Sequence, residues 1–135
     1  MPVQYMLDTN IVSYLLKGQM PALRNRFDRA TVDEIAVSTI TESEVFYGLA
    51  RRPGATRLRF AAEAFFASVA RLPWDSTVAR SHAALRAEQQ RKGKSLSSED
   101  LMIAAHALSL GLTLVTHDHA FSFVEGLKTE DWTVA

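Results

Sequence analysis

The chain has 135 residues, of which 47% are apolar and 22% charged, and this size favours one globular domain over residues 1–135. It contains no cysteine, which excludes disulfide scaffolds, thiolate zinc sites and cysteine nucleophiles. Fifteen acidic and fifteen basic residues cancel, so no overall field points to a nucleic-acid or membrane partner.

The first third of the chain alternates short apolar runs with segments of helical periodicity. Asp8 directly follows the first apolar run, and Gly18 and Pro21 separate the two helical segments. In chain order the predicted elements are a strand over residues 3–7, helices over residues 11–16 and 21–30, and a strand over residues 35–38.

The middle of the chain predicts two helices. Thr41 and Glu44 have the spacing of a capping box, which favours a helix over residues 42–51. A Pro-Gly pair at residues 53–54 ends it, and apolar periodicity predicts the next helix over residues 57–69.

The remaining third continues the same alternation. Asp75 or Ser76 can cap one helix, and Ser97 or Ser98 can cap another that ends at Gly111. The predicted elements are strands over residues 72–74, 112–116 and 132–134, and helices from about residue 76 to Gly93 and from about residue 98 to Gly111. Short apolar strands between helices predict a three-layer α/β/α domain with a central, mainly parallel sheet.

No segment has the features of a targeting sequence or a membrane span. Residues 1–16 lack a basic leading region and contain Asp8, which is atypical of a signal peptide. The longest apolar stretch, residues 101–115, is shorter than the ~20 residues that a span needs and contains His106. We expect a soluble, cytoplasmic protein without a membrane partner.

Four acidic residues lie where a parallel sheet binds its ligands, beyond the carboxyl ends of the strands. Asp8 and Asp118 follow predicted strands, and Glu44 and Asp100 lie in first turns of predicted helices. Each has a structural explanation, because the helix dipole stabilises an acid at the N-terminus by ~0.3–1 kcal/mol. Asp8, an N-cap in that explanation, is the hardest to dismiss, because it interrupts an apolar run.

Carboxylates that converge raise one another's pKa unless a cation neutralises them. Hard oxygen ligands at a partly open site suit Mg²⁺ or Mn²⁺, and such sites commonly act on phosphate esters. The four acids together therefore predict a divalent metal site.

The sequence around these acids resembles the PIN-domain ribonucleases and, more narrowly, the VapC toxins of bacterial type II toxin–antitoxin pairs. The motifs are MLDTNIVSYLL, TESEVFYGLA, EDLMIAAHAL, LTLVTHDHAF and VEGLKTEDW, in the family's order along the whole chain. The resemblance places the family's acidic quartet on Asp8, Glu44, Asp100 and Asp118. It departs from many relatives after Thr116, where this chain reads His-Asp-His.

The resemblance implies roles for these residues. Asp8 and Asp100 would hold Mg²⁺ or Mn²⁺ directly, with Glu44 and Asp118 joining directly or through water. The residues that would orient ligands or water are Thr9, Asn10 and Thr116. Glu99, about 100° around the helix from Asp100, is the alternative ligand.

The implied activity is metal-dependent endonucleolytic cleavage of RNA, with tRNA and possibly initiator tRNA as the target and inhibition of translation as the result. The implied partners are a VapB antitoxin and a second copy of the toxin. Promoter DNA would be bound only through the antitoxin complex.

Several other residues have competing explanations. His117 and His119 flank Asp118, but surface positions are more common for such a pair than a zinc site. His106 is expected in the core, and Asp75 as a helix cap. Three groups of basic residues read either as solvated helix faces or as phosphate contacts: Arg24, Arg26 and Arg29; Arg51, Arg52, Arg57 and Arg59; and Arg86, Arg91, Lys92 and Lys94.

An excess of aromatic residues in two successive helices predicts core packing, or a groove for a partner helix. These residues are Phe46, Tyr47, Phe60, Phe65 and Phe66.

Two other functions stay open. Haloacid-dehalogenase-type phosphatases also place an aspartate after the first strand, but they need a second aspartate where this chain has Asn10. A catalytically inactive PIN module in a repressor or scaffold complex is the non-enzymatic alternative.

Overall fold

The apolar runs form one five-stranded sheet. The computed structural model describes residues 2–94 and 96–135. Its strands are β1 (Tyr5–Leu7), β2 (Ile35–Ser38), β3 (Ala70–Leu72), β4 (Thr113–Val115) and β5 (Thr129–Glu130). All pairings are parallel, in the order β3-β2-β1-β4-β5. In β1, at the centre, Met6 pairs with Ala36 and Leu114.

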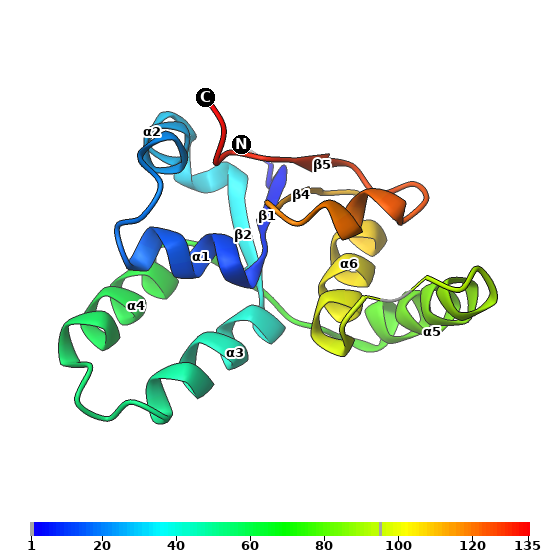
Figure 1. Cartoon of the computed structure of the whole chain (residues 1–135), viewed down its shortest axis with the longest axis horizontal. Helices are drawn as coiled ribbons and strands as arrows, with labels where there is room; N and C mark the ends of the chain where they lie inside the picture. Colours follow the sequence, from blue (N-terminus) through cyan, green and yellow to red (C-terminus); the bar gives the residue numbers. More distant parts are fainter. Residues whose placement is uncertain (1, 95) are drawn as a thin grey trace.

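Helices cover both faces of this sheet. They are α1 (Thr9–Leu16), α2 (Pro21–Arg29), α3 (Thr39–Ala50), α4 (Thr56–Ser68), α5 (Ser76–Arg91) and α6 (Ser98–Leu110), with short 3-10 helices η1 (Val32–Glu34) and η2 (His119–Phe123). In Figure 1, α1 to α4 gather on one side of the sheet and α5 and α6 on the other. The three-layer α/β/α fold with a parallel sheet is confirmed.

The alternation of side chains along the strands creates two cores. Leu7 lies in the first core with Phe66 of α4, and Met6 lies in the second with Ile103 of α6 and Phe121 of η2. All five of these side chains are buried. Because both faces of β1 are covered, the apolar run at the start of the chain has no polar alternation.

The capping box predicted at Thr41 is wrong. α3 begins earlier, at Thr39, because the Ser38 hydroxyl accepts a hydrogen bond from the Ile40 N–H at 3.1 Å. Thr41 is therefore inside the helix and buried. The cap predicted at Asp75 is confirmed, since its carboxylate accepts from the Val78 N–H.

Two strand predictions differ from the structure. The strand predicted over residues 72–74 lies two residues earlier, in β3. The strand predicted over residues 132–134 is wrong, because β5 is Thr129–Glu130. Trp132 is buried although it lies outside a strand, because its ring packs edge-on against that of Tyr5 with 5.0 Å between the centroids.

The aromatic residues of α3 and α4 divide between the core and the surface. Phe66 is buried and its ring lies 5.5 Å from that of Phe46 and 5.3 Å from that of Phe65, whereas Tyr47 and Phe60 are exposed. The core interpretation therefore holds for only part of the set.

Strand order explains where a ligand site belongs. From β1 the chain continues to β2 and β3 on one side of the sheet, and β4 and β5 occupy the other side. In such sheets the crevice lies beyond the carboxyl ends of the strands where this direction changes, here β1 and its neighbours.

Among the described helices, none has the length and apolarity needed to traverse a bilayer.

The N-cap of α6 offers a test of the local fold. The Ser97 hydroxyl accepts a hydrogen bond from the Asp100 N–H at 3.1 Å. Ser97→Ala is expected to lower the free energy of unfolding by about 1 kcal/mol. Ser98→Ala, one residue into the helix, is the matched control and should change it by less than about 0.5 kcal/mol. Equal losses in urea titrations of the two variants would contradict the assignment of the cap.

Candidate active site

Asp8 lies at the centre of the site, where β1 passes into α1. Its side chain is only 3% exposed, and its Oδ1 accepts a hydrogen bond from the Ile11 N–H at 2.9 Å as the N-cap of α1. Its own N–H donates to the Val115 carbonyl of β4 at 3.1 Å. The carboxylate is therefore fixed at the carboxyl ends of the two adjacent strands β1 and β4.

Asp8 is also the most strongly perturbed carboxyl group described. Its pKa is raised from 3.8 to about 6; burial is the largest cause, and the negative charges of Asp100 and Asp118 act in the same direction. Hydrogen bonds from the Thr116 side chain and the Ile11 N–H favour the ionised form and oppose the shift. A buried acid beside two others is typical of a functional site.

Asp100 comes from the first turn of α6, on the other side of the sheet. Partial burial raises its pKa, and the charges of Asp118 and Glu99 act in the same direction, whereas the hydrogen bond with Ser97 lowers it. Asp8, Asp100 and Asp118 thus influence one another although they belong to three separate segments of the chain.

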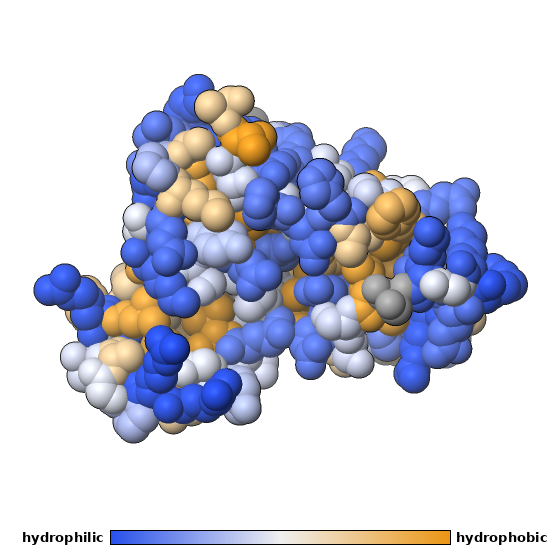
Figure 2. Space-filling model, in the orientation of Figure 1, coloured by the Kyte–Doolittle hydropathy of each residue, from blue (hydrophilic) through white to orange (hydrophobic). Residues whose placement is uncertain are grey.

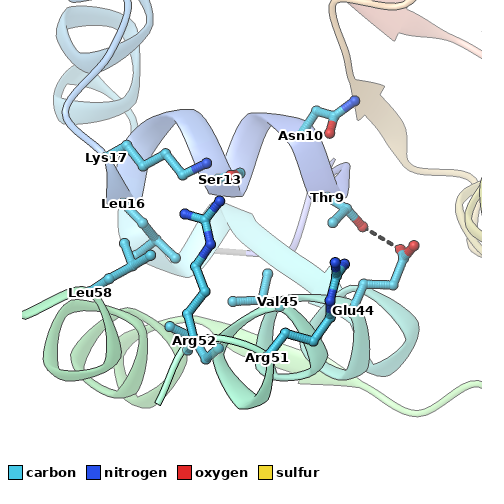
Figure 3. Close-up of a pocket in the computed structure, with 12 residues that line it drawn as sticks. Thr9, Asn10, Ser13, Leu16, Lys17, Glu44, Val45, Arg51, Arg52 and Leu58 are labelled. Carbon is cyan, nitrogen blue, oxygen red and sulfur yellow. Dashed lines mark hydrogen bonds between the residues drawn. The ribbon is translucent and has the colours of Figure 1, made fainter. Parts of the chain in front are cut away.

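Glu44 is held at the edge of the site by Thr9. The Thr9 hydroxyl donates to Glu44 Oε1 at 2.6 Å, as the dashed line in Figure 3 marks, and lies 3.1 Å from the Thr41 hydroxyl. Partial burial raises the Glu44 pKa, the Thr9 hydrogen bond lowers it, and the charges of Glu99 and Asp100 raise it. Glu99, the alternative ligand, is therefore near both Glu44 and Asp100.

Asp118 is the most accessible member of the quartet. It is exposed, caps η2 through a hydrogen bond from the Ala120 N–H to Oδ1 at 2.9 Å, and donates its own N–H to the Thr116 hydroxyl at 3.0 Å. Thr116 is buried and also hydrogen-bonds to Asp8. One threonine therefore connects two of the acids.

The histidines have different surroundings. His106 is fully buried, and its Nδ1 lies 2.8 Å from the Ser38 hydroxyl, which confirms the core position. Burial lowers its pKa. His117 Nδ1 lies 2.8 Å from Asp131 Oδ2 and 3.0 Å from the Thr133 hydroxyl. This second network escaped the sequence reasoning, because its members follow different strands.

A cavity of about 320 Å³ adjoins the acids between α1 and α3. Figure 3 shows Thr9, Asn10 and Glu44 at one end of it and Lys17 and Arg52 at the other. The apolar lining includes Leu16, Val45, Leu49 and Leu58. Lys17 was not anticipated, because a single lysine at a helix end carries no sequence signal.

The donor set fits a hard divalent cation in its chemistry, since carboxylate and hydroxyl oxygens converge at one edge and repel as anions. Within residues 2–94 and 96–135, no three acidic or histidine side chains stand close enough to share an ion. Asp8, Glu44 and Asp118 each accept an internal hydrogen bond at one carboxylate oxygen. Each of these carboxylates keeps free lone pairs beside its hydrogen bonds, and Mg²⁺ commonly needs only one or two carboxylates with water.

Comparisons with known proteins give consistent results. Residues 5–127 match the family model described as PIN domain. The chain is 34% identical to a tRNA(fMet)-specific endonuclease VapC from Shigella flexneri, over 97% of this chain and 99% of that protein. It is also 34% identical to a ribonuclease VapC2 from Haemophilus influenzae, over 96% and 98%.

Solved structures show the same likeness. DNA-bound VapBC from Salmonella typhimurium contains a chain with a TM-score of 0.90 and 33% identity, matched over 96% of this chain and 98% of that one.

The raised pKa of Asp8 predicts a gain in stability on neutralisation. Asp8→Asn keeps a helix-capping side chain, and in EDTA at about pH 8 it should raise the free energy of unfolding by up to about 3 kcal/mol, at ~1.4 kcal/mol per pKa unit. The folded-state pKa lies above the unfolded value of 3.8, so ionisation costs stability as the pH rises through about 6. The gain should vanish below about pH 4.

Asp75→Asn is the matched control, because it makes the same change at the exposed N-cap of α5. Urea titrations across the pH range measure both variants. A gain of equal size at Asp75, or none at Asp8, would contradict the picture of a strained buried acid.

Proposed function

The chain belongs to the PIN-domain family and, within it, to the VapC proteins; on this premise we propose that it is a metal-dependent endoribonuclease, the toxin of a type II toxin–antitoxin pair. The observation that carries the proposal is the buried Asp8 at the end of β1, beside Asp100 and Asp118, which raise its pKa. Such a group is costly for stability unless it binds a cation.

Asp8 and Asp100 would hold one Mg²⁺, or Mn²⁺ in its place. Glu44 and Asp118 would complete its shell directly or through water, with Glu99 as the alternative ligand near Asp100. When bound, such an ion stabilises negative charge on a phosphate and lowers the pKa of water.

The chain's own residues would orient these ligands. Thr9 donates to Glu44 and thereby fixes the direction of one carboxylate. Thr116 hydrogen-bonds to Asp8 and its hydroxyl accepts a hydrogen bond from the Asp118 N–H, so it fixes the positions of the two acids relative to each other. Asn10 is exposed at the mouth of the cavity, where its amide would donate to a phosphate oxygen or to water.

We propose RNA as the substrate, and tRNA as the first class to examine. The relative from Shigella flexneri is named a tRNA(fMet)-specific endonuclease, which makes initiator tRNA the leading candidate. Cleavage of that RNA would inhibit translation, and the toxin would act in the cytoplasm.

The proposed partner is a VapB antitoxin. The similar chains from Salmonella typhimurium and Rickettsia felis belong to VapBC structures with bound DNA, the second with a fragment of their promoter. By analogy, this chain would reach promoter DNA only through its antitoxin. A homodimer is part of the same proposal.

The observations bear differently on the two alternative functions, a haloacid-dehalogenase-type phosphatase and a catalytically inactive PIN module. Membership of the PIN-domain family is evidence against the phosphatase interpretation, as is Asn10 in the place of its second aspartate. An inactive PIN module remains a distinct hypothesis. All four acidic positions are filled, which favours the enzyme, and failure to bind Mg²⁺ or Mn²⁺ in calorimetry would favour the inactive module.

Cleavage of total RNA by the purified protein tests the proposal. Activity is expected with Mg²⁺ or Mn²⁺ and none with EDTA. Asp8→Ala and Asp100→Ala should each lower the rate by more than the ~100-fold that removal of an outer ligand-orienting group typically costs. Glu63→Ala, on the exposed face of α4, is the control. Activity that survives either aspartate substitution would refute the metal assignment.

The hydrogen bond from Thr9 to Glu44 gives a finer test. Thr9→Val removes the donor and is expected to weaken Mg²⁺ affinity by about 10–100-fold, as measured by calorimetry. Thr9→Ser keeps the hydroxyl and should remain close to wild type. Equal affinities in the two variants would show that Thr9 does not orient Glu44.

A further inference from the structure

The cavity between α1 and α3 has an unusual combination of charges. Lys17 at the end of α1 and Arg51 and Arg52 at the end of α3 line it, all three exposed, and Glu44 is its one acidic lining residue. Figure 3 shows Lys17 and Arg52 directed toward each other across the cavity near Ser13. Ser13 adds a hydroxyl between the two cations.

No carboxylate of the described residues neutralises these cations. None of the three forms an ion pair with a carboxylate of the described residues, and Glu44 is engaged by Thr9. Lys17 and Arg52, which Figure 3 shows directed toward each other, repel one another, and an anion bound between them would remove that repulsion. The arrangement therefore favours an anionic ligand in the cavity.

The cavity is continuous with the acidic edge, since Thr9, Asn10 and Glu44 form its other end. A polyanion that approaches Asp8 is repelled by the carboxylates, and cations beside them offset that repulsion. The lining also has an apolar part, and Figure 2 shows apolar side chains beside strongly hydrophilic ones on the side of α1 and α4. A ribose or base matches such a surface.

We propose that this cavity binds a phosphate of the RNA strand next to the one that is cut, held by Lys17, Arg51 and Arg52. The inference rests on the proposed ribonuclease function and names the residues that position its substrate. Tyr47 supports a nucleic acid over an acidic peptide, because its ring is 64% exposed one turn after Glu44. Arg51 lies 5.6 Å from that ring, an arrangement suited to stacking a base.

Binding of RNA without cleavage tests the proposal. The probe is a fluorescein-labelled RNA hairpin with a single-stranded loop, titrated in EDTA with the Asp100→Asn protein at several salt concentrations. In that background, K17A/R51A/R52A is expected to weaken binding at least tenfold at low salt. The slope of log K against log salt should become shallower by about 0.7, the contribution of the one phosphate of a single strand that the protein no longer neutralises.

The matched control removes the same residue types elsewhere. Arg80, Arg91 and Lys128 are exposed, lie outside the cavity and form no ion pair within the described residues. R80A/R91A/K128A should keep most of the affinity and slope. Because all six side chains are exposed, both variants should melt like the parent protein.

Three outcomes would overturn the inference. Affinity unchanged by the cavity variant would do so, as would an equal loss in the control, which would indicate a general charge effect. The third is that K17A/R51A/R52A loses affinity for a poly-glutamate peptide but not for the RNA. The cavity would then bind an acidic protein segment.

Cleavage separates this inference from the proposed function. If wild-type protein cuts RNA with Mg²⁺ and the cavity variant binds and cuts equally well, the function stands and the phosphate site is wrong. If the wild type neither cuts nor binds RNA, the function fails and the inference fails with it.

Discussion

Burial of the Asp8 carboxyl group beside other acids is the constraint on which the site depends. The sheet places Asp8 at the carboxyl ends of β1 and β4 with 3% exposure, and the fold brings Asp100 and Asp118 near it. Burial and repulsion raise its pKa to about 6, a stability cost that natural proteins accept mainly at functional sites. A divalent cation removes both parts of the cost, because it replaces the missing hydration and neutralises the neighbouring charges.

The rest of the molecule holds these acids in place without a cation. Asp8 and Asp118 cap helices, Thr9 binds Glu44, and Thr116 hydrogen-bonds to Asp8 and Asp118. The buried contact between His106 of α6 and Ser38, the cap of α3, joins the helices that carry Asp100 and Glu44. Side-chain hydrogen bonds thus connect elements from both faces of the sheet around one edge.

Local signals were enough to predict the parallel sheet and most helices, because apolar runs and capping residues act over a few positions. Asp8 and Asp118 were predicted to lie together because parallel strands end at one edge. Contacts between distant segments were not predictable. Ser38 and His106, which contact each other, are 68 positions apart. Trp132 is buried because it packs against Tyr5, although it is not itself part of a strand. Lys17 can be recognised as part of a cavity only once the fold places it opposite Arg52.

Proton release on metal binding tests the central claim most directly. Calorimetric titration of Mn²⁺ near pH 6, repeated in buffers of different ionisation enthalpy, counts the protons displaced from the ligands. A carboxyl group with a pKa of about 6 should release a substantial fraction of a proton there, and the release should disappear at about pH 8, where the group is already ionised. Binding without proton release, or no binding of Mn²⁺, would contradict the claim that Asp8 is a buried carboxyl group of raised pKa that binds a divalent cation.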